Sequence, residues 1–291
     1  MKLIKPSFEI WEQSVGLEGV YKQIEKVGRV CYKSEDKITE DSAKPFVDRM
    51  IKSGHGAMLE HGTVYLKFET LTRAEKYLNN KYSEVRTCYG SFYVTTNLRV
   101  LVENGWLDDL QYICEPTEYH ERRVTVHFVC DRGVSHEFVR HRVMSFAQES
   151  TRYCNYSKDK FGNELTFIIP CWLDVPTGHY AYWDGDWCDI DKMKIQLPEG
   201  EHKDIDAFLW TLNNAETHYT LLINSGWKPQ EARSVLPNSL KTELVVTGFT
   251  SDWNHFFDLR ARGTTGTPHP QAKELAEPLM KEFITRKYIN N

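Results

Sequence analysis

The residues best suited to chemistry lie between Arg140 and Tyr153. This stretch holds three arginines, one histidine and two serines but a single carboxylate, Glu149, in a chain whose formal net charge is −5. Guanidinium groups stay charged at neutral pH, and their fork of N–H donors matches phosphates and carboxylates. Such a cluster in an acidic chain favours a pocket for one particular anion, with a solvated surface network as the ordinary alternative.

The spacing of the arginines predicts two anionic ligands. We expect a short helix over residues 135–142, on which Arg140 and Arg142 would point about 200° apart. They would then serve two ligands, or two parts of a large one. The following residues, 148–152, are expected to form a turn whose backbone N–H groups and Ser150 hydroxyl could hold a phosphate. The stretch therefore predicts a meeting point of two phosphate-bearing molecules.

Other motifs point away from metal chemistry. His136 and His141 are five residues apart, which on a helix separates their rings by about 140°, whereas a zinc-binding helix spaces its histidines four apart. The run 184–191 is rich in aspartate but lacks the glycine and closing glutamate of a calcium loop, so we interpret it as a solvated turn. The sequence predicts no metal site, and a metal-dependent hydrolase is a remote alternative.

The main competing hypothesis is a nucleotide-binding or RNA-binding module. Arg140, Arg142 and Arg152 would contact phosphates, and tyrosines would act as stacking platforms. A sequence pI near 6.1 does not favour general nucleic-acid binding, for which a basic domain is expected. The chain also lacks a glycine-rich phosphate loop and the nucleophile motif of hydrolases.

Hydrophobic periodicity predicts the elements that position these residues. Helices and strands follow one another without regular alternation, which favours a single α+β domain over residues 1–291, with an antiparallel sheet packed against helices. Segments 71–121 and 171–200 are interpreted as insertions, and residues 170–200 as a loop. The expected helices are 17–30, 42–54, 71–81, 98–114, 201–225, 251–262 and 270–287, and the expected strands are 63–68, 124–130, 165–169 and 244–250.

Cysteine usage and hydropathy predict an intracellular protein. The seven cysteines are widely spaced and form no Cys-x-x-Cys pair, which is typical of reduced thiols. No stretch approaches the roughly 20 apolar residues that span a bilayer, and the N-terminus shows no secretory leader. A soluble, cytoplasmic protein is therefore expected.

Several blocks together resemble one family. Arg140-His141-Arg142, seven residues and then Ser150 resemble the signature of the flavin-dependent thymidylate synthases, known as the ThyX family. Further blocks occur in the order seen in that family. They are Gly28-Arg29-Val30-Cys31, Met58-Leu59-Glu60-His61, Ala232-Arg233-Ser234-Val235-Leu236-Pro237 and the segment from Trp253 to Arg260.

This resemblance implies an activity and an assembly. Members of the family methylate dUMP to dTMP, with 5,10-methylenetetrahydrofolate as carbon donor and NADPH as reductant acting through FAD. They are homotetramers in which several subunits build each active site. The resemblance thus implies small-molecule partners and self-association, and neither nucleic acid nor membrane as a partner.

The resemblance also implies roles for single residues. Arg260 is implied to lie against the uracil ring as a catalytic residue, His61 to act near the flavin and folate, and Arg233 to reach dUMP from another subunit. Ser150 is implied to be a dUMP ligand, since no general base is evident beside it. Positions that match flavin contacts are Thr63, Arg140, His141, Arg142, Gln148, Phe249, Ser251 and His255. Positions that match dUMP contacts are Glu137, Arg140, Gln148, Glu149, Ser150, Thr151, Arg152, Arg233 and Arg260.

Overall fold

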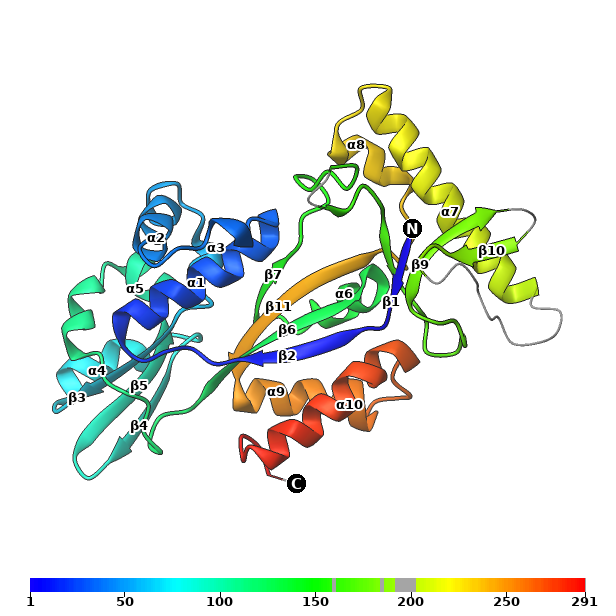
Figure 1. Ribbon diagram of the computed structural model, residues 1–291. Coiled ribbons are helices and arrows are strands. Elements are labelled where there is room, and N and C mark those ends of the chain that lie inside the picture. Colours follow the sequence, from blue (N-terminus) through cyan, green and yellow to red (C-terminus); the bar gives the residue numbers. More distant parts are fainter. Residues whose placement is uncertain (159–160, 184–185, 192–202, 291) are drawn as a thin grey trace.

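The computed structural model describes residues 1–158, 161–183, 186–191 and 203–290 (Figure 1). These residues form three β-sheets of four, four and three strands, surrounded by helices that follow the strands without regular alternation. The predicted α+β class is therefore confirmed. None of the helices in the described ranges is long and apolar enough to cross a membrane.

The central sheet consists of β2 (Ser7–Trp11), β6 (Arg123–Asp131), β11 (Lys241–Phe249) and β7 (Ser145–Gln148), in that spatial order. All three neighbouring pairs are antiparallel, and β6 and β11 pair over nine positions. Side chains alternate between the two faces of a strand. Each long strand therefore presents one apolar face and one face with many polar groups.

The apolar face packs on α9 (Thr250–Phe257) and α10 (Pro270–Thr285), which lie beneath the sheet in Figure 1. A π-helical segment, η5 (Asp258–Arg262), joins these helices. Burial of each large apolar side chain stabilises the fold by about 1.5–3 kcal/mol, so this core fixes the helices firmly. Its members include Val124, Val126, Phe128, Leu244, Val246, Trp253, Phe256, Phe257 and Phe283.

The opposite face of the central sheet is covered by α1 (Gly16–Tyr32). Only a small apolar cluster lies between them, with Val27 and Val30 of α1 packed near Val245 of β11. The helix ends where Lys33 adopts a left-handed conformation at φ 48°. Polar side chains occupy much of the remaining face, and these form the network described below.

The second sheet belongs to a lobe with its own apolar core. It orders β3 (Thr63–Phe68), β5 (Ser91–Asn97) and β4 (Glu84–Cys88), all antiparallel. The predicted helix 98–114 is divided at Gly105, whose φ of +70° ends the first half. The helices of this lobe are α2 (Ala43–Lys52), α3 (Gly56–Leu59), α4 (Leu71–Leu78), α5 (Leu98–Asn104) and the 3-10 helix η2 (Leu107–Tyr112).

The third sheet corrects the prediction of a loop over residues 170–200. Strands β9 (Gly178–Trp183) and β10 (Asp186–Asp189) form an antiparallel hairpin, and β9 pairs with β1 (Lys2–Ile4), which runs parallel to β8 (Thr166–Ile168). The solvated turn predicted over 184–191 is likewise wrong for its described part, because Trp187 is buried in β10. The remaining residues of these predictions, 184–185 and 192–200, lie outside the described ranges.

One long helix, α7 (Lys203–Asn224), packs against this third sheet. Its buried Leu209 and Leu212 share a core with Trp187 and Tyr180 of the hairpin. The short helices α8 (Pro229–Ala232) and η4 (Arg233–Val235) follow and lead into β11. This connection carries Arg233 toward the central sheet.

Candidate functional site

The residues Arg140–Arg142, here called the Arg-His-Arg motif, follow the end of α6 (Arg132–Phe138). The predicted helix over 135–142 was therefore wrong beyond Phe138, where the chain enters a turn. Because the motif is not helical, helix geometry does not set the angle between its two arginines, and the predicted divergence of about 200° has no basis. Both guanidinium groups are exposed, and within the described part of the chain neither forms an ion pair or a hydrogen bond.

Arg260 lies in η5 and points its donors at the α6 region. Its Nη1 donates to Glu137 Oε2 at 2.6 Å, its Nη2 to the Glu137 carbonyl at 2.8 Å, and its Nε to His141 Nε2 at 3.3 Å. The side chain is 15% exposed. The structure thus brings Arg260 together with Glu137 and His141, which lie more than 100 positions earlier in the chain. All three are predicted site residues.

His141 carries no charge in this cluster at neutral pH. Burial first, and then the nearby positive charges of Arg260 and His255, lower the pKa of His141 to about 4. A neutral imidazole can accept the hydrogen bond from Arg260. His255 is exposed, with its ring centroid 5.9 Å from that of His141. The cluster therefore presents the fixed positive charge of Arg260, oriented by the Glu137 carboxylate.

The turn at residues 149–152 follows β7. Several of its backbone N–H groups already form hydrogen bonds within the chain. The Glu149 N–H donates to the Glu243 carbonyl at 2.8 Å, and the Ser150 N–H donates to the Cys31 carbonyl at 3.0 Å. The Arg152 N–H donates to Ser150 Oγ at 3.3 Å. These three N–H groups are therefore already bonded inside the chain. The predicted phosphate cradle cannot be made from them in this structure. The groups left for a ligand are mainly side chains.

Two arginines lie beside this turn. Arg233 Nη1 donates to Thr151 Oγ1 at 3.2 Å, and Arg152 Nε donates to Gln230 Oε1 at 3.2 Å. Both arginines are exposed, and neither has a carboxylate partner among the described residues. Thr151 is buried and serves Arg233, so its hydroxyl is an internal contact. Arg233 therefore reaches the turn of its own chain, whereas its predicted service to another subunit stays a prediction.

Glu149, a predicted dUMP contact, is buried in the single chain, and its contact with dUMP stays a prediction. The residue is 2% exposed, and both oxygens of its carboxylate are occupied. Oε1 accepts from the Tyr156 hydroxyl at 2.9 Å, and Oε2 accepts from Lys241 Nζ at 2.8 Å. The side chain points into the protein because burial of a carboxylate requires charged or hydrogen-bonding partners, and these lie inside.

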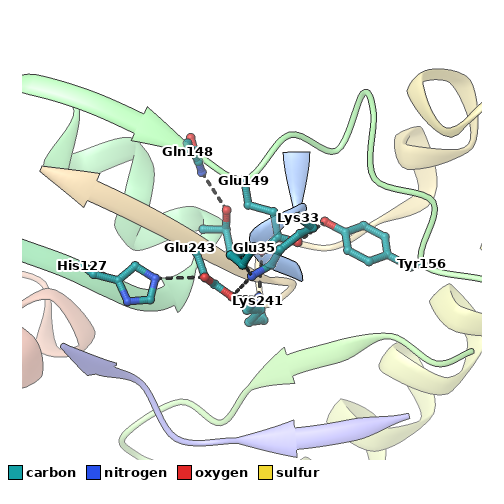
Figure 2. Close-up of polar contacts among 9 residues, drawn as sticks. Lys33, Glu35, His127, Gln148, Glu149, Tyr156, Lys241 and Glu243 are labelled. Carbon is teal, nitrogen blue, oxygen red and sulfur yellow. Dashed lines mark hydrogen bonds and ion pairs between the residues drawn. The ribbon is translucent and has the colours of Figure 1, made fainter. Parts of the chain in front are cut away.

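Glu149 belongs to a network that the sequence analysis missed (Figure 2). Lys241 Nζ also donates to Glu243 Oε1 at 2.5 Å, and Glu243 further accepts from Lys33 and, at 2.9 Å, from His127 Nε2. Burial alone would raise the pKa of Glu243, but His127, Lys241 and Lys33 lower it below its usual range. The sequence feature that could have revealed this network is Lys241 and Glu243, two charged residues on one face at the start of a largely apolar strand.

Gln148 links the turn to α6. Its Nε2 donates to Ser135 Oγ at 2.9 Å and to Thr242 Oγ1 at 3.1 Å. Gln148 is the last residue of β7, and not part of the turn as predicted. Its side chain amide therefore connects the strand before the turn to the helix that carries Glu137. The predicted contacts of Gln148 with flavin and dUMP would have to compete with these internal bonds.

His61 and Thr63 lie in the interior of the single chain, and their predicted contacts with flavin and folate stay predictions. His61 is 0% exposed, its Nδ1 is 2.8 Å from Thr247 Oγ1, and burial lowers its pKa to about 3. Thr63 is 5% exposed, and its hydroxyl accepts from Arg123 Nη1 at 3.3 Å. Both are held in the contact between the lobe and the central sheet. Their burial results from contacts with residues far away in the sequence, so the sequence around His61 and Thr63 does not reveal it.

Phe249 and Ser251, predicted flavin contacts, differ in access. Phe249 is buried at the start of α9, with its ring centroid 5.5 Å from the guanidinium carbon of Arg123, and so it cannot line an open site. Ser251 is exposed in the first turn of α9. It lines a cavity of about 570 Å³ together with Arg86 and Arg262. Of these two residues, only Ser251 is therefore accessible to a ligand in this structure.

The site residues thus fall into two joined clusters. One contains Glu137, His141 and Arg260, and the other contains the 149–152 turn with Arg233. Within the described residues, no three histidine, cysteine, aspartate or glutamate side chains are grouped as a metal ion would require. Each cluster contains at least one arginine side chain, Arg260 in the first and Arg233 in the second.

Comparison with known families shows which family this chain belongs to. A model of the family described as thymidylate synthase complementing protein matches residues 82–286, most of the chain. The chain belongs to this family. The predicted resemblance to flavin-dependent thymidylate synthases is confirmed at this level. The matched range of this thymidylate synthase complementing family contains the Arg-His-Arg motif, the 149–152 turn, Arg233 and Arg260.

Sequence relatives named flavin-dependent thymidylate synthase agree with this membership. A flavin-dependent thymidylate synthase from Pyrococcus furiosus is 31% identical over 160 residues, which cover 55% of this chain but only 53% of that protein, about half its length. A protein of the same name from Corynebacterium aurimucosum is 22% identical over 275 residues, covering 94% of this chain and 80% of that one. A solved UMP/dUMP methylase, PolB from Streptomyces cacaoi, aligns with 98% of this chain and 93% of its own at 17% identity and a TM-score of 0.45.

Proposed function

We propose that this protein is a flavin-dependent thymidylate synthase that converts dUMP to dTMP. One observation supports the proposal most strongly. In a member of this family, four arginines around the site have no carboxylate partner among the described residues, while a fifth, Arg260, is held in place by Glu137. Guanidinium groups without a carboxylate partner are well suited to bind the phosphate groups of a ligand. The four are Arg140, Arg142, Arg152 and Arg233.

The two clusters can divide the work on dUMP. Arg152, Arg233 and the Ser150 hydroxyl suit its phosphate, because they cluster at one turn. Arg260 suits the uracil ring, where methylation at C5 requires negative charge to build on the ring nitrogen and carbonyls. A fixed guanidinium in a half-buried site stabilises such charge. Glu137 keeps the guanidinium oriented, and Ser150 acts as a ligand and not as a nucleophile.

FAD fits the exposed part of the Arg-His-Arg motif. Two exposed guanidinium groups, Arg140 and Arg142, suit the diphosphate of a dinucleotide. Beside α1 and α3, a cavity of about 390 Å³ lined by Cys31, Tyr32 and Met58 offers apolar and aromatic contacts. When bound, FAD supplies the hydride chemistry, with NADPH as the proposed reductant and methylenetetrahydrofolate as the proposed carbon donor.

We also propose that the protein assembles as a homotetramer. Large apolar side chains around the site are exposed in the single chain, including Val143 at 61% and Tyr153 at 58%. A second subunit that covered them would also close the site around its ligands. The family implies this assembly, and the exposed side chains are compatible with it.

The direct test is the spectrum and turnover of the purified protein. We expect flavin absorbance bands, dUMP-dependent oxidation of NADPH, and release of the C5 proton of dUMP when methylenetetrahydrofolate is present. A colourless protein that does not take up FAD and shows no dUMP-dependent oxidation would refute the proposal. The RNA-binding alternative instead predicts oligonucleotide affinity that falls steeply with salt.

A further inference from the structure

Lys241, the first residue of β11, joins two carboxylates behind the turn: Glu149, which follows β7, and Glu243 of β11. Its ammonium donates to Glu149 at 2.8 Å and to Glu243 at 2.5 Å, and its side chain is 15% exposed. Glu243 has two further cationic or hydrogen-bonding partners, Lys33 and His127. Glu149 has no other cation among the described residues. Figure 2 draws Lys241, both carboxylates and their neighbours in this network.

Glu149 in turn closes the loop that carries the substrate-binding side chains. Its carboxylate accepts from the hydroxyl of Tyr156, seven residues further along, at 2.9 Å. Ser150 and Arg152 lie between these two ends. Inside the loop, the Ser150 carbonyl accepts from the N–H groups of Tyr153 and Cys154. The loop is therefore a closed unit whose inner anchor is one buried carboxylate.

We propose that Lys241 is a positioning residue for substrate binding. By neutralising and holding the Glu149 carboxylate inside the protein, it keeps the Ser150 hydroxyl and the Arg152 guanidinium directed at an anionic substrate. This inference rests on the proposed function, and it adds a residue that contacts no ligand itself.

The electrostatics explain why a cation is required at this position. Two carboxylates that share one ammonium repel each other when the ammonium is removed. A buried charge without its partner is strongly destabilising. Glu149 would then turn toward water or take up a proton, and either change releases the loop from its anchor. Glu243 would remain held by Lys33 and His127, so the disturbance is directed at Glu149 and the turn.

Substitution of Lys241 by methionine tests the proposal. We expect Lys241→Met to weaken dUMP binding roughly 10-fold to 100-fold, the range of coupling within one polar network. Turnover at saturating dUMP should stay close to that of the wild type, because Arg260 and Glu137 are untouched. Lys241→Arg, which keeps the charge, should restore most of the affinity. The measurements are dUMP titration calorimetry and steady-state KM and kcat.

A double substitution separates positioning from stability alone. Lys241→Met combined with Glu149→Gln removes both charges, and we expect it to bind dUMP more tightly than Lys241→Met does. Hydrogen exchange should show faster exchange of the Ser150 and Cys154 amides in Lys241→Met, and slower exchange again in the double variant. This readout requires no ligand and remains informative if one variant folds poorly.

The lobe offers a matched control. Asp109 is buried and accepts from the Tyr77 hydroxyl at 2.6 Å and from Lys76 Nζ at 2.6 Å, the same set of partners that holds Glu149. Lys76→Met should lower the melting temperature but leave dUMP affinity at the wild-type value. Equal dUMP affinity of Lys241→Met and wild type, with unchanged exchange at Ser150, would overturn the inference. A wild-type protein that does not bind dUMP would overturn the proposed function and the substrate role together.

Discussion

The lobe and the central sheet each bury a carboxylate held by one tyrosine hydroxyl and one lysine. In the lobe, Asp109 lies between Tyr77 and Lys76. In the central sheet, Glu149 lies between Tyr156 and Lys241. The partners are chemically the same, and both carboxylates are almost fully buried. The comparison therefore isolates what the surrounding chain contributes.

The difference lies in what each carboxylate anchors. Asp109 fixes a 3-10 helix against α4, and the neighbouring side chains pack in the apolar core of the lobe. Glu149 fixes a turn whose other side chains, Ser150 and Arg152, face outward without carboxylate partners among the described residues. The same local stabilisation supports packing in one region and, under the proposed function, ligand binding in the other. Function depends on which unpaired groups the anchored segment carries.

The largest effects should come from the two apolar cores. Leu98→Ala in the lobe and Leu244→Ala in the central sheet each remove a fully buried side chain and should cost about 2–5 kcal/mol of unfolding free energy. Hydrogen exchange measures where the loss falls. We expect Leu98→Ala to weaken protection mainly in β3 and β5, and Leu244→Ala to weaken β6 and β11. Equal loss in all strands would show that lobe and sheet unfold as one unit.

Removal of Arg260 should abolish most activity without comparable loss of stability. Arg260→Ala should lower turnover by about 10²–10³-fold, the usual cost of losing a donor that stabilises developing charge. The matched variant away from the site is Arg286→Ala, which removes an arginine paired with Glu12 and Glu282. It should retain turnover near that of the wild type. Similar losses in both variants, measured as kcat, would refute the assignment of catalysis to Arg260.

Arg152→Ala should act on binding alone. A charge-assisted hydrogen bond contributes about 1.5–3 kcal/mol, so dUMP affinity should fall by roughly 10-fold to 100-fold. Arg73 in the lobe, whose guanidinium carbon lies 4.7 Å from the ring centroid of Tyr112, provides the control. Arg73→Ala should leave the dissociation constant for dUMP unchanged. An unchanged constant in Arg152→Ala would remove this arginine from the phosphate site.

The smallest expected effect is a pH dependence of stability from buried histidines. Burial lowers the pKa of His61 to about 3, so the folded protein keeps it neutral while the unfolded chain takes up a proton below about pH 6.5. Stability is then complete above that pH and falls as the pH decreases, by about 1.4 kcal/mol at pH 5.5. Urea titrations of His61→Gln should show a weaker dependence over this range.

The lobe histidine His120 offers the corresponding comparison. Burial also lowers its pKa from the ordinary value. A shift in the same direction has the same sign in its effect on stability, so His120→Gln should also reduce the loss of stability at low pH. A pH dependence that neither substitution reduces would assign it to the carboxylates.

Local patterns in the sequence predicted elements well where one strand or helix decides its own burial. Strand β3 was predicted at the residues it occupies, because Val64, Leu66 and Phe68 alternate with less buried neighbours. The hairpin of β9 and β10 was missed because its stability depends on pairing with β1, far away in the sequence. Its sequence is rich in aspartate and glycine as well as aromatic residues, so no regular alternation marks the strands.

The site was predictable in its residue types and less so in its geometry. The arginines and Glu137 were recognisable because charged donors cluster in the sequence and match a family signature. Lys241 was not, because its contact with Glu149 joins residues 92 positions apart. The burial of His61 depends on Thr247, 186 positions away. Sequence spacing carries no information on such contacts unless a pattern of homologues or a structure supplies it.

The π-helical segment η5 sets the direction of the Arg260 side chain. The number of residues in its turn fixes how far each side chain is rotated about the helix axis. A wider turn accommodates one residue more than an α-helical turn, and each residue in a helix rotates the next side chain by about 100°. Here the Gly263 N–H bonds back to the Asp258 carbonyl, five residues earlier. Deleting one residue from this turn would keep every side chain of the site and yet aim Arg260 elsewhere. The contacts of Arg260 therefore depend on its rotational position in the helix as well as on its being an arginine.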